Sequence, residues 1–538
     1  MKSSAENDTR RAFLRRCALT IGTAAMANIS CRHVRQKQAA PQSHPSPPKR
    51  PNIIFIHTDS WDGRVLGCLA HPAVKNATPN IDRLARRGTV FRNAYCSHPI
   101  CCPSRANMWS GTYTFRCESW NNYKGLHENA PTVMARLKKA GWRFASDQGG
   151  YGKHDYTSGG HSQLARVTAW TGPADIQLPV YRMEAPRVLE DNIDRVQSDD
   201  WDDVDRAKSF LARYAGDGSP FFLYLGIRAP HPPFTTSRKW LDMVDRSAVT
   251  IPPEDAEIHP VMKYQRITKN WMHGFSKETV LATRAIYYAM CAETDAMVGQ
   301  VLDEMDRLGL AENTYFIVSS DHGENNMEHR QFYKMNMYES SVRVPLVIAG
   351  PGVRQGAVVD NIVSLIDIYP TLMDMANLEC PRGLDGESLM PLLQGKTAAS
   401  RNWAFAAFTG TSANTTMFML RKDDWKYIAY PGYRPQLFNL ADDPDEIRNL
   451  ARAKPDIVKQ LDADLRRIVD YEQVHKRCMA YNKDSFLQWR QQVKAYPIRL
   501  KEYGADKEKA TYDQVMANCY IGWSPEHEAK LERWLQGV

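Results

Sequence analysis

The chain has 538 residues, of which 43% are hydrophobic and 24% are charged, and it is long enough for one large domain and a smaller one. It contains no run of 18 apolar residues, so we expect no membrane span, and its eleven cysteines are too irregularly placed for a disulfide scaffold. The formal charge of +8 lies in residues 1–50, which hold ten Lys or Arg against two Asp or Glu, so residues 51–538 are formally neutral and we expect no nucleic-acid partner.

The first predicted segment is a leader over residues 1–31. Arg10 and Arg11 precede a mildly apolar stretch over residues 18–27, a pattern that resembles a twin-arginine export signal. A disordered basic tail is the alternative. Export would place the mature protein in the periplasm or at the cell surface. Lipid anchoring through Cys31 stays open, although the residues before it fit a lipobox poorly.

The next segments predict a linker and then a large α/β domain over residues 51–395. Residues 32–50 are rich in Pro, Gln and Ser, which is typical of a linker. Apolar runs of strand length alternate with helical periodicity; the strands are expected at 52–57, 221–227 and 315–318, and the helices at 80–87, 130–140, 202–214 and 279–308. This alternation predicts a largely parallel or mixed sheet that is covered by helices on both faces.

Polar residues follow each of these three apolar runs. Such sheets bind ligands at the carboxyl ends of their strands. We therefore expect Asp59, His231 and Asp321 to be neighbours in space, although they are far apart in the sequence.

The pattern changes after residue 395. Short strands are expected at 403–408, 417–420 and 425–430, and an amphipathic helix at 455–471. They predict a smaller C-terminal α+β subdomain over residues 396–478. The tail over residues 479–538 alternates aromatic and charged residues at helical spacing, and we expect it to pack on the body.

The sharpest motif is the run Cys101, Cys102, Pro103, Ser104 and Arg105. It resembles the signature of the type I sulfatase family, in which a Cys followed two positions later by Pro and four later by Arg is oxidised to formylglycine (3-oxoalanine). Pro103 lies two residues after Cys101 but only one after Cys102, so the register favours Cys101. Two buried thiols beside a turn are the alternative for an isolated motif.

The resemblance to this family extends over nearly all of residues 51–478. Further family-like blocks stand in the family order: Asp59, 230–233, 320–324, Lys334, 338–345, 367–372, 384–393 and 437–450. The resemblance implies an alkaline-phosphatase-like fold, in which helices enclose a large mixed sheet. It also implies hydrolysis of a sulfuric ester, with Cys101 as the modified nucleophile.

The resemblance further implies a site for one divalent cation, Ca²⁺ or alternatively Mg²⁺. Asp59 and Asp321 are the hard oxygen ligands that these ions prefer. Ser60, His322 and residue 101 complete the expected ligand set. Ser60 departs from the family, because many members carry a second Asp there. A turn with an Asp cap is the alternative for the block at Asp321.

Cationic side chains are expected around the sulfate, because the ester is anionic and its transition state spreads negative charge. The candidates are Arg105, Lys153 and Lys334. His231 is the candidate for binding sulfate and protonating the leaving oxygen. His161 is a further catalytic candidate, although the family usually places a His two residues after the Lys, where this chain has Asp155.

The implied mechanism uses both hydroxyls of hydrated formylglycine. One attacks sulfur and releases the sugar alcohol. A base then removes the proton of the other, which expels sulfate and regenerates the aldehyde.

Three blocks, at residues 59–64, 118–125 and 152–162, resemble a subgroup associated with removal of 2-O-sulfate from hexuronic acid, chiefly glucuronate, in glycosaminoglycans. The expected partners are therefore a sulfated oligosaccharide and a formylglycine-generating maturation enzyme. Trp120, Asn122 and Lys124 are candidates for contact with the uronate. A surface helix with a packed Trp is the alternative.

Three other functions compete with this interpretation. A phosphonate monoester or phosphodiester hydrolase of the same superfamily would use the same metal and formylglycine. A two-zinc phosphatase would carry Ser or Thr as nucleophile and more His ligands. A non-catalytic glycan-binding relative would usually lack the nucleophile or the metal ligands, whereas the chain retains Cys101, Arg105, Asp59, Asp321 and Lys334.

Overall fold

The described residues of the computed structural model begin at Arg50 and lie within one compact unit. The described residues are 50–146, 149–157, 176–178, 186–189, 193–272, 274–396, 401–410, 412–496 and 511–537. The expected leader, with Cys31, and nearly all of the linker lie outside them. Within these ranges, no helix combines the length and the apolar character that crossing a membrane requires.

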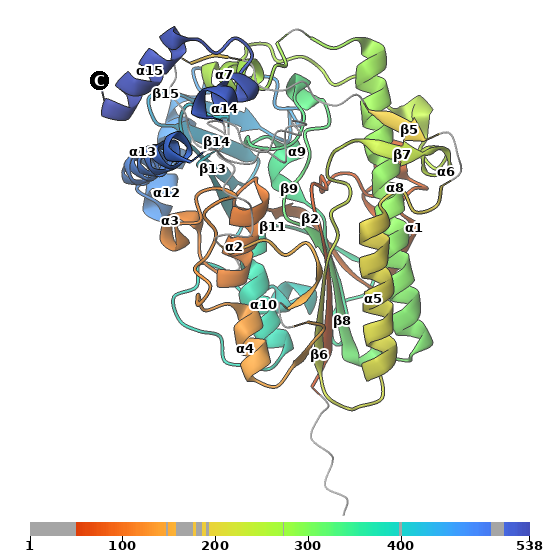
Figure 1. Ribbon diagram of the computed structural model, residues 1–538. Helices are drawn as coiled ribbons and strands as arrows, with labels where there is room; N and C mark the ends of the chain where they lie inside the picture. Colours follow the sequence, from red (N-terminus) through yellow and green to blue (C-terminus); the bar gives the residue numbers. More distant parts are fainter. Residues whose placement is uncertain are drawn as a thin grey trace, which may run out of the picture. The chain divides into compact units, whose positions relative to one another are not determined.

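A nine-stranded mixed sheet forms the centre of the fold (Figure 1). Its strands are β1 (Asn52–Thr58), β2 (Gly88–Tyr95), β3 (Arg143–Phe144), β4 (Gly150–Gly152), β6 (Phe221–Gly226), β8 (Thr314–Ser320), β9 (Arg343–Val344), β10 (Leu346–Ala349) and β11 (Ala357–Ser364). The order is β11-β2-β10-β8-β1-β6-β3, with β4 also paired to β6 and β9 to β2. β1 is parallel to β6 and β8, whereas β10 is antiparallel to β8 and β2.

The three strands expected from apolar runs are confirmed as β1, β6 and β8, and each is buried along its whole length. Buried parallel strands are apolar on both faces, which is why their pattern is continuous. No sequence pattern above predicts β2, β10 or β11. β2 and β11 carry polar residues that interrupt their apolar runs, such as Arg92 and Asp360, which form an ion pair with each other.

Helices cover both faces of this sheet (Figure 1). One face carries α1 (Pro79–Arg87), α5 (Ser198–Tyr214) and α8 (Lys277–Arg307), and the other carries α2 (Cys101–Ser110), α4 (Val133–Lys139) and α10 (Ile368–Met375). The expected helix at 130–140 begins late, because Pro131 precedes it and the Thr132 hydroxyl caps it by accepting from Ala135 N at 3.2 Å. Shorter elements are α3 (Thr114–Cys117), α6 (Arg238–Leu241), α7 (Pro260–Thr268), α9 (Glu339–Val342), α11 (Met390–Leu393), β5 (Arg187–Leu189) and β7 (Thr235–Ser237).

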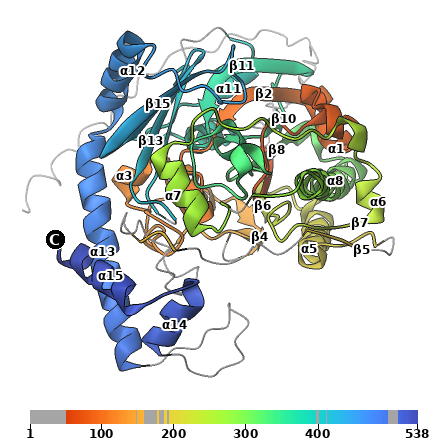
Figure 2. The same ribbon diagram turned by 90° about the horizontal axis from the view of Figure 1, so that it is seen from above.

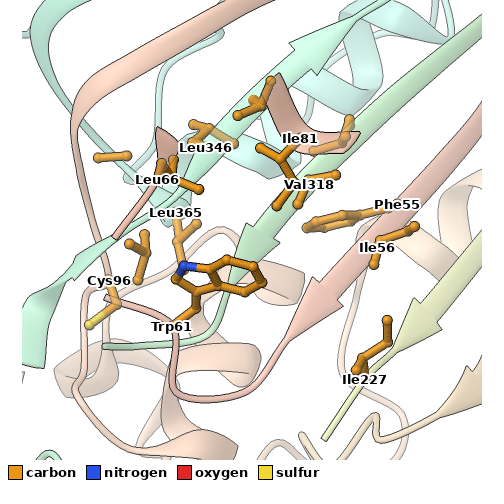
Figure 3. Close-up of a cluster of buried hydrophobic side chains, with 14 of the residues drawn as sticks. Phe55, Ile56, Trp61, Leu66, Ile81, Cys96, Ile227, Val318, Leu346 and Leu365 are labelled. Carbon is orange, nitrogen blue, oxygen red and sulfur yellow. The ribbon is translucent and has the colours of Figure 1, made fainter. Parts of the chain in front are cut away.

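An apolar core anchors the segment that follows β1 (Figure 3). Side chains of three strands and α1 are fully buried in it: Phe55, Ile56, Ile81, Val318 and Leu346. Trp61 is buried among them, and its indole N–H donates to Val65 O at 2.9 Å. Burial of each large apolar side chain contributes roughly 1.5–3 kcal/mol. Trp61 therefore holds the turn that carries Asp59.

A second, antiparallel sheet follows in the chain. Its strands, in order, are β12 (Trp403–Phe408), β13 (Met417–Lys422), β14 (Trp425–Tyr430) and β15 (Tyr433–Asn439), and α12 (Pro455–Ile468) packs on β13 and β14. The three expected strands are confirmed. β15 was not expected because it contains Pro435, and proline is confined mostly to edge strands such as this one.

The C-terminal tail is helical in its described part. It contains α13 (Tyr471–Ala495), α14 (Tyr512–Cys519) and α15 (Pro525–Gln536), and α13 runs unbroken across residues 478 and 479, where the sequence suggested a boundary. Figure 2 shows α14 and α15 beside the second half of α13. Their apolar side chains form a separate small core that includes Ile176, and Tyr123 packs against it.

Candidate active site

The ends of β1 and β8 place two aspartates side by side. Thr58 lies opposite Ser320 in the parallel register, and Asp321 N donates to Thr58 O at 3.1 Å. Asp59 and Asp321, the next residue of each strand, are therefore neighbours, and both are fully buried. His231 lies in the loop that follows β6, the strand on the other side of β1.

Cys101 is the first residue of α2, and this helix brings it to the two aspartates. Its Sγ lies 3.3 Å from His322 Nε2 and 3.8 Å from Asp59 Oδ1. One ligand atom from each of Asp59, Cys101, Asp321 and His322 lies within 4.8 Å of the others, and all four residues are buried. Residues from three distant segments thus form one group.

His322 presents an unprotonated nitrogen to this group. Its Nδ1 lies 3.0 Å from Gly323 O, and because a carbonyl only accepts, Nδ1 carries the proton and Nε2 the lone pair. Burial, and then the charge of Lys334, hold the pKa of His322 well below its usual range. A neutral imidazole whose other nitrogen is fixed by a carbonyl is a common metal ligand, and two carboxylates beside it fit a divalent cation.

The two carboxylates differ in their pKa. Burial raises the pKa of Asp321, and the neighbouring charge of Asp59 raises it further. Burial also opposes ionisation of Asp59, but Lys153, Lys334 and the surrounding cations overcome it and hold the Asp59 pKa well below its usual range. A bound cation would favour ionisation of both.

Three cations contact this acidic pair. The buried guanidinium of Arg105 lies 3.1 Å from Asp59 Oδ2 and 2.9 Å from Asp321 Oδ2. The Lys153 ammonium forms an ion pair with Asp59, and Lys334 Nζ lies 3.9 Å from Asp59 Oδ1. The positive charge expected from the sequence is therefore present at the site.

Ser60 lies between these groups. Its hydroxyl donates to Asp59 Oδ1 at 3.0 Å and accepts from Lys334 Nζ at 3.3 Å. These contacts link the Lys334 side chain to Asp59. A direct role for Ser60 in metal binding stays a prediction.

Sequence reasoning assigned no role to Asp155, which forms an ion pair with Arg105. The available signal was its place two residues after Lys153, where the family usually has His. Arg105 thus contacts three carboxylates, and this fixes the orientation of its planar group.

A buried chain of hydrogen bonds holds the backbone of Lys153. Tyr224 OH lies 3.0 Å from His57 Nδ1 and donates to Lys153 O at 3.2 Å. Lys153 N donates to Gly226 O at 2.7 Å, and a Cβ at residue 226 would lie 1.8 Å from Lys153 O. Only glycine allows this approach. The sequence showed no signal for His57 or Tyr224, because both lie inside apolar strands.

A pocket of about 720 Å³ opens beside the cluster, and its lining includes Lys153, Asp155, Gln197, Arg228 and His231. His231 Nδ1 lies 2.6 Å from Pro232 O, so its Nε2 carries the lone pair. Burial, and then the charge of Lys334, lower the pKa of His231 to about 3. The ring is neutral without substrate, whereas the sequence suggested a proton held near neutrality. His161 lies outside the described residues.

The residues suggested for uronate contact have other partners. Trp120 is 2% exposed and packs in the core of the C-terminal sheet. Asn122 Oδ1 accepts from Cys102 N at 3.1 Å in the first turn of α2, and Lys124 Nζ lies 3.5 Å from Glu118. None of the three is among the residues that line the pocket. These contacts agree with the alternative of local packing, and contact of the three residues with a uronate stays a prediction.

Comparisons with known proteins agree with this geometry. The family model "Sulfatase" matches residues 51–378, and the model "N-sulphoglucosamine sulphohydrolase, C-terminal" matches residues 327–471. Arylsulfatase K of Canis lupus familiaris is 40% identical over 523 residues, which cover 91% of this chain and 94% of the relative. The blocks at 59–64, 118–125 and 152–162 resemble arylsulfatase K, and this comparison confirms that resemblance.

Two solved structures show the same fold. A phosphonate monoester hydrolase of Agrobacterium radiobacter matches with a TM-score of 0.65 and 23% identity, covering 80% of this chain and 96% of that one. A 2-O GAG sulfatase matches with a TM-score of 0.62 and 22% identity, covering 82% and 94%. These likenesses confirm the expected alkaline-phosphatase-like architecture, and at this identity they establish the fold alone.

Proposed function

This chain belongs to the sulfatase family and is a sulfatase, and from that premise we propose that it removes the 2-O-sulfate of a hexuronic acid, glucuronate, from a glycosaminoglycan-type glycan. The blocks at 59–64, 118–125 and 152–162 support this substrate, as does the 40% identity to arylsulfatase K. The observation that carries the proposal is the buried group of Asp59, Cys101, Asp321 and His322 beside a pocket lined by cationic side chains.

Residue 101 is the proposed nucleophile in its formylglycine form. Burial, and then the charge of Asp59, raise the pKa of the unmodified Cys101 thiol to about 12, so the thiolate would be scarce at neutral pH. As its hydrate, formylglycine supplies one hydroxyl for attack on sulfur and a second for release of sulfate. The residue begins α2, where the helix dipole favours negative charge.

The proposed cation is a single Ca²⁺, with Mg²⁺ as the alternative. Asp59, Asp321, His322 and the modified residue 101 are its proposed ligands, and Ser60 is a further candidate. When bound, such an ion polarises a sulfuryl oxygen and the nucleophile together. Arg105 contacts both carboxylates and keeps them oriented toward this position.

Lys153 and Lys334 are the proposed partners of the sulfuryl oxygens, because both reach the Asp59 carboxylate from different segments. His231 is the proposed proton donor to the leaving oxygen. An incoming sulfate ester offsets the charge of Lys334, which is one of the causes of the low His231 pKa. The negative charge of the ester therefore acts to raise the His231 pKa, against the lowering by burial. The role of His161 stays a prediction.

The proposal includes two steps before catalysis. A formylglycine-generating enzyme oxidises Cys101, and the folded protein is then exported through the twin-arginine-like leader to the periplasm or the cell surface. The motif around residue 101 and the pattern at Arg10 and Arg11 support these steps.

Relative rates on three substrates test the function: a 2-O-sulfated glucuronide, an aryl sulfate and an aryl phosphodiester. We expect the glucuronide to have the highest kcat/KM. Mass analysis of the peptide that contains residue 101 should find formylglycine in active enzyme. Dominant diesterase activity would favour the phosphonate or phosphodiester alternative, binding of the glycan without turnover would favour a non-catalytic relative, and a retained thiol in active enzyme would contradict the nucleophile.

A further inference from the structure

Arg228 is a half-exposed cation on the wall of the pocket. It shares the described lining with Lys153, whose ammonium forms an ion pair with Asp59. The Arg228 side chain is 51% exposed, and its ion pairs reach no carboxylate of the buried metal-ligand group. A ligand in the pocket can therefore reach this guanidinium without disturbing that group.

Acidic residues of α5 hold Arg228 through one nitrogen only. Nη1 lies 3.5 Å from Asp200, 3.9 Å from Asp199 and 3.9 Å from Asp203. These distances exceed the roughly 2.7–2.9 Å of a strong charge-assisted hydrogen bond. Nε and Nη2 donate to no acceptor in the described part of the chain. Nε and Nη2 of the planar guanidinium are thus available to donate to a carboxylate.

The backbone of Arg228 is fixed in relation to His231. Asp200, which is buried, accepts from Arg228 N at 3.0 Å and from Ala229 N at 2.8 Å. His231 N donates to Arg228 O at 3.0 Å, which closes a turn of four residues. Arg228 and His231 therefore stand on one rigid turn at the same wall of the pocket.

The chemistry of a 2-O-sulfated hexuronic acid matches two separate cationic positions. Its sulfate is on carbon 2 and its carboxylate on carbon 5, at opposite ends of the pyranose ring. If the sulfur lies at residue 101, the carboxylate points away from the buried group, and Arg228 is a cation of the pocket that stands apart from that group.

We propose that Arg228 forms a carboxylate-binding subsite, in which Nε and Nη2 bind the uronate carboxylate and so set the preference for acidic sugars. This inference rests on the proposed function. It adds a substrate contact that the sequence motifs do not assign.

Arg228→Gln in the full-length modified enzyme tests the subsite. The substrates are a 2-O-sulfated glucuronide and its carboxyl-reduced analogue, which keeps the sulfate and the ring. We expect kcat/KM for the glucuronide to fall about 10- to 100-fold more than for the analogue, mainly through KM, because a bidentate charge-assisted contact is lost. Arg228→Lys should recover part of the loss, since an ammonium keeps the charge but not the fork.

Arg206→Gln is the matched control. Arg206 is on α5, beside the acidic residues that contact Arg228; it is 60% exposed and forms an ion pair with Asp203, but it is not among the residues that line this pocket. The Arg206→Gln substitution also removes one positive charge beside the acidic residues of α5. We expect it to leave the ratio between the two substrates unchanged.

The outcomes separate this inference from the proposed function. A wild-type enzyme that does not hydrolyse the 2-O-sulfated glucuronide contradicts the proposed function. A wild-type enzyme that hydrolyses the glucuronide and its reduced analogue with equal kcat/KM contradicts the subsite alone. A wild-type preference that survives in Arg228→Gln contradicts the subsite alone. Equal losses on both substrates, or an Arg206→Gln variant that changes the ratio as much, also overturn the subsite, because they indicate a structural or long-range charge effect.

Discussion

Two of the buried charge clusters in the described part of the chain make an instructive pair, because we propose only one of them as the active site. In the active-site cluster, Arg105, Lys153 and Lys334 surround Asp59 and Asp321. In the second cluster, Lys426 of β14 lies 2.8 Å from both Glu339 of α9 and Glu446. Lys426 is 0% exposed, so burial of charge is common to both.

The clusters differ in where their charged groups lie relative to the pocket. The Lys426 ammonium has three donors, and it contacts two carboxylates and Met337 O, at 2.9 Å. None of these residues lines the pocket. In the active-site cluster, the lone pair of His322 Nε2 and the Cys101 side chain converge on one point beside the pocket. Ligand atoms that converge beside a cavity mark a candidate site, whereas buried charge alone does not.

The largest expected effect is a loss of activity when the active-site cluster is changed. Cys101→Ala should lower kcat/KM on an aryl sulfate by about 10⁴-fold or more, because the nucleophile is removed. The melting temperature should change little, because the side chain is small and lies beside the pocket. Cys102→Ala should retain most of the activity. An active Cys101→Ala with an inactive Cys102→Ala would show that the other thiol is modified.

The next largest effect is a loss of stability when the Lys426 cluster is changed. Lys426→Met leaves two buried carboxylates without their cation, so the free energy of unfolding should fall by about 3–5 kcal/mol. The kcat/KM of the folded fraction should be unchanged. Chemical denaturation measures the free energy of unfolding, and assays at low temperature measure kcat/KM.

Lys422→Met is the control for this stability change. Lys422 lies on the neighbouring strand β13 and forms a pair with Asp464 at 2.8 Å, with its side chain 34% exposed. A partly exposed pair is worth at most about 1 kcal/mol. Equal losses of unfolding free energy in the two variants would mean that burial of Lys426 adds nothing to the stability of the protein.

A smaller effect tests His322 as a member of the proposed metal-ligand group. His322→Ala should weaken Ca²⁺ binding by at least about tenfold, since it removes the neutral nitrogen that faces the carboxylates. Titration calorimetry and the Ca²⁺-dependent rise in melting temperature measure this directly. Chelation should lower the activity of the wild-type enzyme, and Ca²⁺ should restore it. The exposed His127→Ala serves as control, and unchanged affinity in His322→Ala would remove His322 from the ligand set.

The smallest effect is the response of the Lys426 cluster to acid. Burial by itself raises the pKa of Glu339, but Lys426 and two arginines hold it at about 2, below the ordinary 4.5. As pH falls, Glu339 is therefore protonated at a higher pH in the unfolded chain than in the folded protein. The stabilisation by Glu339 is present above about pH 4.5 and is lost as pH falls toward 2.

One proton changes the free energy of unfolding by at most about 1.4 kcal/mol per pH unit. The raised pKa of Glu446, caused first by its burial, acts in the opposite direction. Glu339→Gln should reduce the acid slope of wild-type stability between pH 4.5 and 2. An unchanged slope would mean that Glu339 is not the group that titrates.

Local sequence patterns predicted most of the fold and the membership of the buried site. β1, β6 and β8 were predictable because strands buried on both faces are continuously apolar. Sheets of this kind bind ligands at the carboxyl ends of their strands, and this rule placed Asp59 near Asp321. β2 and β11 escaped prediction because their polar residues pair with each other, which only the folded sheet reveals.

The amino-acid sequence by itself determined the family, and it predicted the register that favours Cys101 and the residues that could hold a cation, because these depend on side-chain type and short spacing. The tertiary structure decided which groups carry protons and which donors remain for a substrate. The neutral state of His231, the three carboxylates around Arg105 and the available donors of Arg228 all depend on neighbours from distant segments. A pKa or a hydrogen bond is set by distances of a few ångströms, and these exist only once the chain is folded.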